Sequence, residues 1–186
     1  LSRDEELPDR WPVFGTTGYD FLALVNGLFV DSSAERSFNR IYATWSEGTR
    51  SFSEVIFRTK TEAQIHSMSA ELQIVAQQLD RISEKNRRHR DFTLNVLTAA
   101  LRDVIAAFPV YRPYVDKPGM SSPDRTYIEI AVARARRENP SVHGSVFDFI
   151  RSTLLLQPPD GADDDYLRAQ LEFVRKFQQV TSPVTA

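Results

Sequence analysis

The chain has 186 residues, 41% of them hydrophobic, so it can bury one sizeable core, and a single domain is the default interpretation. Lys and Arg number 23 against 25 Asp and Glu, a net charge of -2, which argues against a protein whose main partner is nucleic acid or another polyanion. The absence of cysteine excludes disulfides and Cys-ligated metal sites and fits a cytoplasmic location.

The first thirty residues predict a connector, a short strand and a helix. Residues 1–12 are polar and contain two prolines, as an exposed connector does. Val13 and Phe14 lead into a Gly-Thr-Thr-Gly turn, residues 15–18. Because glycine permits tight backbone turns, the pattern predicts a short buried strand over Val13 to Thr16 that ends in this turn. From Tyr19 onward, apolar residues recur at helical spacing, so a helix follows the turn.

The DSSAE stretch predicts the start of a second helix. Ser32 and Glu35 stand three residues apart, the spacing at which a cap hydroxyl and a carboxylate satisfy each other's backbone amides. We expect this helix to end near Gly48.

The clearest periodic pattern follows Arg50 and predicts the longest helix of the chain. Six apolar residues alternate spacings of three and four and form a narrow stripe: Ile65, Met68, Leu72, Val75, Leu79 and Ile82. Such a stripe packs against neighbouring helices in coiled-coil fashion. We therefore expect one continuous helix over residues 52–84.

The next helix lies between Asp91, which can cap it, and Pro109, which stops it. The sequence FPVYRPYV, residues 108–115, then predicts an extended segment, because each proline restricts its own backbone and that of the preceding residue. Ser122 followed by Pro123 is typical of a cap and the first helical position, so a helix resumes there and runs toward residue 139.

Two amphipathic helices, roughly 144–156 and 163–179, complete the predicted elements. The breaker QPPDGADDD separates them, and its carboxylates lie where the dipole of the second helix favours negative charge. No apolar stretch approaches the roughly 18 residues that a membrane span requires, so we expect no membrane partner.

The sequence offers no metal or cofactor site. His66, His89 and His143 lack ligand spacing and are interpreted as solvated or hydrogen-bonded side chains. The Gly-Thr-Thr-Gly turn lacks the lysine of a phosphate-binding loop and is no dinucleotide fingerprint. We therefore expect no metal and no cofactor.

Charged residues are interpreted as surface features. The basic cluster KNRRHR, residues 85–90, can grip phosphates, but near the end of a helix it also complements the helix dipole, and this second interpretation is preferred over nucleic-acid contact. Asp124 and Glu129 are interpreted as surface charges, since nothing marks them as an acid/base couple.

Several stretches together resemble one enzyme family. WPVFGTTGYDFL followed by GLFVD, then RRHRDFT, FPVYRPYV and KFQQVTSPVTA, resemble maltooligosyl trehalose synthase of the α-amylase superfamily over essentially the whole chain. Two positions depart from the family pattern: Ser182 stands where Gly is more usual, and Pro113 where Thr is more usual. Because the chain also begins with Leu, we expect it to be an internal segment of a longer protein.

The resemblance implies a fold and an activity. The fold class it implies is mainly α: a helical insertion, residues 31–186, of a (β/α)8 barrel enzyme, with residues 1–30 supplying one short barrel strand, its turn and a helix. The implied activity converts the reducing-end α-1,4 linkage of a maltooligosaccharide into an α,α-1,1 linkage. Enzymes of this type use two carboxylates and retain the anomeric configuration. In the family these carboxylates and an assisting Asp lie outside the stretch that resembles this chain, so we expect no catalytic residue here.

Two clusters are candidates for binding maltooligosaccharide in the full-length enzyme. They are Thr17, Tyr19 and Asp20 after the predicted strand, and Tyr111 and Arg112 in the extended segment. Sugar sites combine aromatic faces with planar or carboxylate hydrogen-bonding groups, and loops after barrel strands build such sites. The alternatives are that both tyrosines are core aromatics and that Asp20 pairs with Arg112 or caps the following helix.

A second class of function also fits the sequence. The stripe over residues 65–82 is equally typical of a non-catalytic helical scaffold that binds protein partners. The coding sequence on either side of the chain discriminates between the two classes.

Overall fold

The computed structural model describes residues 7, 11–15, 18–46, 50–115 and 120–185, apart from the side chains of Tyr19 and Asp20. The described residues are mainly helical and contain no strand. The elements are α1 (Tyr19–Gly27), η1 (Ser32–Ala34), α2 (Glu35–Trp45), α3 (Phe52–His66), α4 (Ser69–Glu84), α5 (Leu94–Ala107), α6 (Ser122–Glu138), α7 (Gly144–Leu154) and α8 (Asp164–Thr185). The prediction of a mainly helical chain is confirmed.

Contacts divide the chain into two compact units, Leu1–Val55 and Ile56–Ala186. They are called unit 1 and unit 2 below. The boundary expected after residue 30 separates a piece of a barrel from its insertion, and this division stays a prediction.

Unit 1 contains α1, η1 and α2, and these three elements bury none of their described side chains. Asp31 begins η1 by accepting a hydrogen bond from the Ser33 backbone N–H at 2.9 Å. This aspartate, rather than the predicted Ser32, provides the cap, and α2 begins at Glu35. A stripe on α2 is largely exposed: Phe38, Ile41, Tyr42 and Trp45.

The strand predicted over Val13 to Thr16 is not formed in the described residues. Val13 to Gly15 carry no strand assignment, and Thr16 lies outside the described ranges. A strand requires a neighbour that pairs with its backbone. Phe14 and Val13 are also exposed, so the sequence pattern of a buried strand has no packing partner within the described chain.

The single long helix predicted over residues 52–84 is wrong, because it is two helices. The backbone N–H groups of Ser67 and Met68 both donate to the Ala63 carbonyl, at 2.9 and 3.1 Å, and the wide turn ends α3. Met68 takes a non-helical backbone conformation before α4 begins. On α3, ahead of the break, Gln64 is fully buried, while Ile65 of the predicted stripe is 47% exposed. The longest helix is instead α8, with 22 residues.

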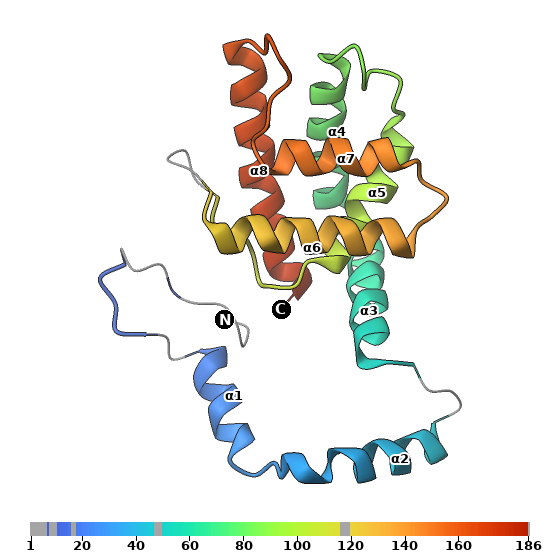
Figure 1. Ribbon diagram of the computed structural model, residues 1–186, viewed down its shortest axis with the longest axis vertical. Coiled ribbons are helices and arrows are strands. Elements are labelled where there is room, and N and C mark those ends of the chain that lie inside the picture. Colours follow the sequence, from blue (N-terminus) through green and yellow to red (C-terminus); the bar gives the residue numbers. More distant parts are fainter. Residues whose placement is uncertain (1–6, 8–10, 16–17, 47–49, 116–119, 186) are drawn as a thin grey trace. The chain divides into compact units, whose positions relative to one another are not determined.

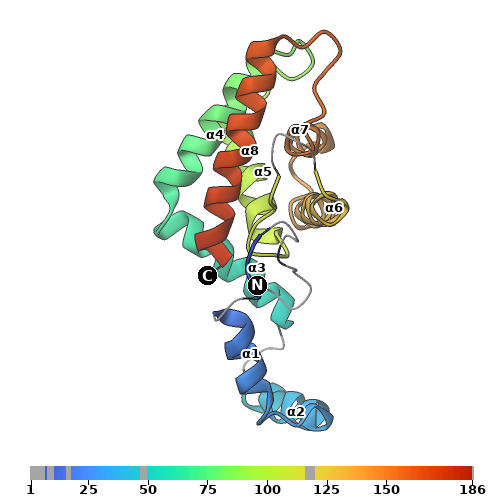
Figure 2. The same cartoon turned by 90° about the vertical axis from the view of Figure 1, so that its left-hand side faces the viewer.

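Unit 2 has two layers of helices. Helices α4, α5 and α8 lie side by side, and α6 and α7 lie across them, as the views of Figure 1 and Figure 2 show from two directions. Helix α6 packs on α5 and α7, and α7 also contacts α8. This arrangement encloses one core between the layers.

The core of unit 2 is built from large apolar side chains on all of these helices. Aromatic rings meet within it: Phe108 and Phe177 pack edge to face with centroids 5.6 Å apart. Its largest fully buried members are Phe108, Phe147, Phe149, Phe173, Phe177, Leu79, Ile82, Leu97, Leu101, Ile105, Ile128 and Ile150. The α4 half of the predicted stripe, from Leu72 to Ile82, contributes to this core as expected.

Two helix caps lie one or two residues away from their predicted positions. Thr93, not Asp91, caps α5, and its hydroxyl accepts from the Val96 N–H. Ser121, not Ser122, caps α6, so Pro123 stands at the second helical position. None of the helices in the described ranges combines the length and hydropathy that a bilayer-spanning segment requires.

Candidate functional site

The segment FPVYRPYV leaves the end of α5 as extended chain and alternates buried with accessible side chains. Phe108, Val110, Pro113 and Val115 are buried, whereas Tyr111 is 37% exposed. The two prolines keep the backbone out of helical conformation, as the sequence predicts. The buried side chains therefore anchor the segment in the protein, and the side chains between them are accessible to solvent.

Two side chains fasten the backbone of this segment to the helices. The Gln178 amide of α8 accepts from the Val115 N–H at 2.9 Å and donates to the Val115 carbonyl at 3.1 Å. The Asp124 carboxylate of α6 accepts from the Tyr114 N–H at 3.1 Å and from the Ser121 hydroxyl at 2.5 Å. Gln178 thereby joins FPVYRPYV to KFQQVTSPVTA, two stretches that are 63 residues apart at this contact.

Lys60 of α3 fastens the other end of the segment. Its ammonium group donates to the Phe108 carbonyl at 3.0 Å and to the Thr185 hydroxyl at 3.1 Å. Burial lowers the pKa of Lys60 to about 8, and the charge of Arg134 lowers it further in the same direction. One lysine thus links three parts of unit 2 that are distant in sequence.

Tyr111 and Arg112 are the predicted site residues that the structure describes. The Arg112 guanidinium lies over the Tyr114 ring, with its central carbon 4.9 Å from the ring centroid. The Tyr111 ring is 37% exposed and the Arg112 side chain is partly exposed. An aromatic face and planar hydrogen-bond donors are groups that can bind a sugar ring and its vicinal hydroxyls.

The first predicted cluster lies outside what the structure describes. Thr17 is not among the described residues, and only the backbone of Tyr19 and Asp20 is described, at the first turn of α1. The predicted sugar contacts of these three residues stay predictions, as does the alternative pairing of Asp20 with Arg112.

The interpretation of Asp124 as a surface charge is wrong. Asp124 is buried, because its carboxylate is used to hold the Tyr114 backbone and to complete the cap of α6. Glu129 is partly exposed and binds the Arg151 guanidinium through both of its oxygens, at 2.5 and 2.6 Å. The hydrogen bonds from Arg151 hold the pKa of Glu129 below its usual value, which favours a carboxylate rather than a proton donor.

The expectation of solvated or hydrogen-bonded histidines holds for His66 and His143 but is wrong for His89, whose buried Nδ1 has no hydrogen-bond partner within the described residues. His66 is exposed at the end of α3, and His143 caps α7 by accepting from the Ser145 N–H. The ring of His89 packs against Phe149 at 4.5 Å and against Phe92 at 5.4 Å between centroids. Within the described ranges no group of three His, Asp or Glu side chains is placed to hold a metal ion.

Sequence reasoning missed the residues that fasten the segment, Gln178 and Lys60. A signal for Gln178 exists in the pattern: it stands on the apolar face of α8, between the buried Val174 and Thr181. A polar amide on such a face must find hydrogen-bond partners inside the protein. Nothing in the local sequence distinguishes Lys60 from exposed lysines, because its partners come from distant residues.

Comparisons with protein families, with curated proteins and with solved structures find no match to this chain.

Proposed function

We propose that the chain is an internal part of an enzyme that rearranges the reducing end of maltooligosaccharides, as the resemblance to maltooligosyl trehalose synthase implies. The enzyme converts the terminal α-1,4 linkage into an α,α-1,1 linkage by intramolecular transglucosylation. Residues 1–30 belong to its (β/α)8 barrel, and residues 31–186 form a helical insertion beside the active site. The transfer requires a nucleophile and an acid/base placed across one bond, and both come from the parts of the enzyme outside this chain.

The observation that carries the proposal is the way the FPVYRPYV segment is held. Gln178, Asp124 and Lys60 fix its backbone from three helices, while the side chains of Tyr111 and Arg112 remain at least partly exposed. A rigid support that presents an aromatic face and a guanidinium is suited to bind a sugar in a fixed orientation. Tyr111 and Arg112 contact the maltooligosaccharide in this proposal, together with Thr17, Tyr19 and Asp20.

The exposed apolar side chains of unit 1 support a position within a larger protein. Helices α1 and α2 and the residues between them expose large hydrophobic side chains, among them Leu24, Leu28, Phe29, Phe38 and Trp45, each at least 70% exposed. Several large exposed apolar side chains on one short stretch are typical of an interface. In the proposal, the remainder of the catalytic domain covers it.

Substitution of the proposed sugar contacts in the intact enzyme tests the assignment. Asp20→Asn and Arg112→Lys should each reduce turnover while leaving the melting temperature nearly unchanged, because neither replacement removes packing volume. Should both variants instead lose several kcal/mol of stability and keep full turnover in the folded fraction, these residues are structural and the sugar-contact assignment is wrong.

A non-catalytic scaffold is the second candidate function, and the apolar stripe on α2 favours it. Phe38, Ile41, Tyr42 and Trp45 follow the i, i+3, i+4, i+7 spacing by which a helix docks into the groove of a partner. The flanking coding sequence separates the two candidates. The enzyme requires an acid/base Glu in the segment just upstream and an Asp in the segment just downstream, whereas a scaffold requires neither.

A further inference from the structure

A groove of about 930 Å³ lies in unit 2 between two loops that are far apart in sequence. One wall is the α4–α5 loop with the basic cluster of residues 85–89, and the other is the α7–α8 loop of residues 157–163. Both loops lie at the same end of unit 2 in Figure 1 and Figure 2. The size lies at the upper end of the roughly 300–1,000 Å³ that ligand pockets occupy.

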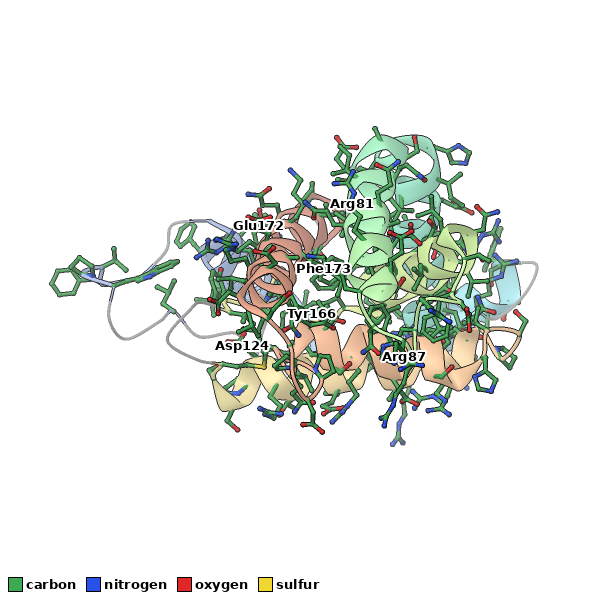
Figure 3. All side chains as sticks on the ribbon, turned by 90° about the horizontal axis from the view of Figure 1, so that it is seen from above. Arg81, Arg87, Asp124, Tyr166, Glu172 and Phe173 are labelled. Atoms are coloured by element: carbon green, nitrogen blue, oxygen red, sulfur yellow. The ribbon has the colours of Figure 1, made fainter. Side chains whose placement is uncertain are left out.

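The two walls carry opposite hydrogen-bonding character. Lys85, Arg87 and Arg88 on the first wall can only donate hydrogen bonds. Asp160 and Asp163 on the second wall are acceptors when ionised. Figure 3 looks onto this end of unit 2 and labels Arg87 and Tyr166, one residue from each side of the groove.

The charged groups that face the groove are largely unused by the fold. Within the described ranges, no ion pair or hydrogen bond engages the side chains of Lys85, Arg87, Arg88 or Asp160. By contrast, Asp165 at the edge of the groove is already paired with Arg168, and one carboxylate oxygen of Asp163 accepts from the Tyr166 N–H at 2.7 Å, which leaves its other oxygen for a ligand. The free groups are therefore available to a ligand without breaking a contact within unit 2.

Both loops are ordered by their own hydrogen bonds. The Asn86 side chain accepts from the Arg88 N–H at 3.0 Å, and the Asn86 carbonyl accepts from the His89 N–H at 2.9 Å. On the other wall, the Gln157 N–H donates to the Ser152 carbonyl at 2.9 Å, which closes the end of α7. A preformed groove loses less conformational entropy when a ligand binds.

The end of α7 places an unusual residue at the start of the second wall. Leu156 adopts a positive φ of 53°, a conformation that glycine usually takes at this helix end. Its side chain packs against the core, which compensates for the strained backbone and fixes where Gln157 and Pro158 emerge. A turn at Gly161, with φ of 78°, then directs the chain back into α8.

We propose that this groove is a second binding site for an α-1,4-glucan, separate from Tyr111 and Arg112. A sugar hydroxyl both donates and accepts, so a row of hydroxyls can accept from the basic wall and donate to the carboxylates at the same time. Pro158 and Pro159 supply rigid apolar surface for the C–H face of the sugar ring. The choice of an α-1,4-glucan among oligosaccharides rests on the proposed function.

Simple ions fit the groove less well than a neutral polyhydroxyl chain. An anion would be attracted by the two arginines of the first wall, Arg87 and Arg88, but repelled by the carboxylates of the second wall, Asp160 and Asp163. A cationic peptide would be attracted by the carboxylates but repelled by the arginines. A neutral sugar chain avoids both repulsions and satisfies both walls.

Titration of the 186-residue chain with maltohexaose, followed by amide NMR, tests the site. We expect shifts to concentrate in residues 85–89 and 157–163. The double variant Arg87→Gln/Arg88→Gln and the single variant Asp160→Asn should each weaken binding by at least about tenfold, because each loses charge-assisted hydrogen bonds. Arg137→Gln on α6, outside the groove, is the matched control and should bind as the original chain does.

Three results would overturn the assignment: no binding by the original chain, equal binding by the groove variants, or equal binding of the β-linked isomer cellohexaose. Displacement of the same signals by inorganic phosphate but not by maltohexaose would likewise replace it with an anion site. These outcomes are independent of the transglucosylation assay on the enzyme extended by its own flanking sequence. If maltohexaose does not bind in the groove, the result of the transglucosylation assay is unaffected. If the extended enzyme shows no transglucosylation, a measured binding of maltohexaose in the groove is unaffected.

Discussion

Buried polar side chains decide how the parts of unit 2 are joined. Gln64, Gln170 and Gln178 are all buried, and each amide bonds backbone groups of another segment. Gln170, for example, donates to the carbonyls of Ser152 and Thr153 at the end of α7. Such an amide stabilises the fold only while its partners remain in place, because removal leaves buried backbone groups unsatisfied.

Substitution of Gln178 tests most directly how much a buried amide contributes to stability. Gln178→Leu keeps the volume nearly constant but leaves the Val115 N–H and carbonyl without partners, so we expect a loss of about 2–4 kcal/mol in unfolding free energy. The exposed neighbour provides the control, since Gln179→Leu should change stability by less than about 0.5 kcal/mol. Urea unfolding curves measure both, and equal midpoints for the two variants would show that the Val115 contact contributes nothing.

Lys60 predicts a pH dependence of stability. Its pKa is about 8 in the folded chain and 10.5 in the unfolded chain, so between these values the unfolded state binds more protons. Stability from this group therefore rises as pH increases from about 8 toward 10.5 and is lost as pH falls back through 8. The difference in unfolding free energy between the original chain and Lys60→Met should grow over this range. A difference that stays flat with pH would contradict the burial of a titrating lysine here.

At the scale of elements, periodicity predicted where helices lie better than where they begin and end. The apolar spacing located α5, α7 and α8, since burial of one face depends on residues within the helix itself, and the Ser-Pro pair at residues 122 and 123 indicated α6. The break at Ser67 and Met68 escaped prediction because the apolar spacing runs through it unchanged. The wide turn at Ala63, to which both Ser67 and Met68 donate, ends α3 without a signal in the apolar pattern.

The sequence prediction and the structure assign the cap of α5 to different residues, and substitution of each residue tests which assignment is right. Thr93→Ala should cost about 1 kcal/mol, because the hydroxyl that accepts from the Val96 N–H is lost. Asp91→Ala, at the position that the sequence favoured, should change stability by less than about 0.5 kcal/mol. Thermal unfolding of the two variants measures the difference, and the reverse order would place the cap at Asp91.

The candidate site was predictable only where local sequence determines it. The two prolines of FPVYRPYV indicated an extended segment, and the tyrosine and arginine within it indicated sugar-binding chemistry. The groups that hold the segment come from α3, α6 and α8, so no local pattern contains them. The buried role of Asp124 was missed for the same reason, since its partner Tyr114 is ten residues away.

At the scale of the whole molecule, the two units differ in how they bury apolar surface. All buried hydrophobic side chains of the described residues lie between Leu72 and Val184, within unit 2. The described helices α1 and α2 of unit 1 bury none. Unit 2 therefore has the core required for independent folding, whereas the described side chains of α1 and α2 form no core of their own.

A shortened chain tests this division. Residues 50–186 retain the start of α3, where the Ser51 N–H donates to the Glu54 carboxylate at 2.7 Å and caps the helix. We expect this chain to unfold cooperatively, with a melting temperature within about 4 °C of the full chain, a shift that corresponds to about 1 kcal/mol at this size. Calorimetry of both chains measures the shift. Loss of cooperative unfolding in residues 50–186 would contradict an independent core.

An assay with maltopentaose tests the proposed role in glucan rearrangement most directly. The protein extended on both sides by its own coding sequence should consume reducing ends and form maltotriosyl trehalose, whose α,α-1,1 linkage is identified by NMR. The isolated 186-residue chain should form none, because the resemblance implies that the two carboxylates required for transfer lie outside it. Product from the isolated chain, or an extended protein that leaves maltopentaose unchanged, would contradict the proposal.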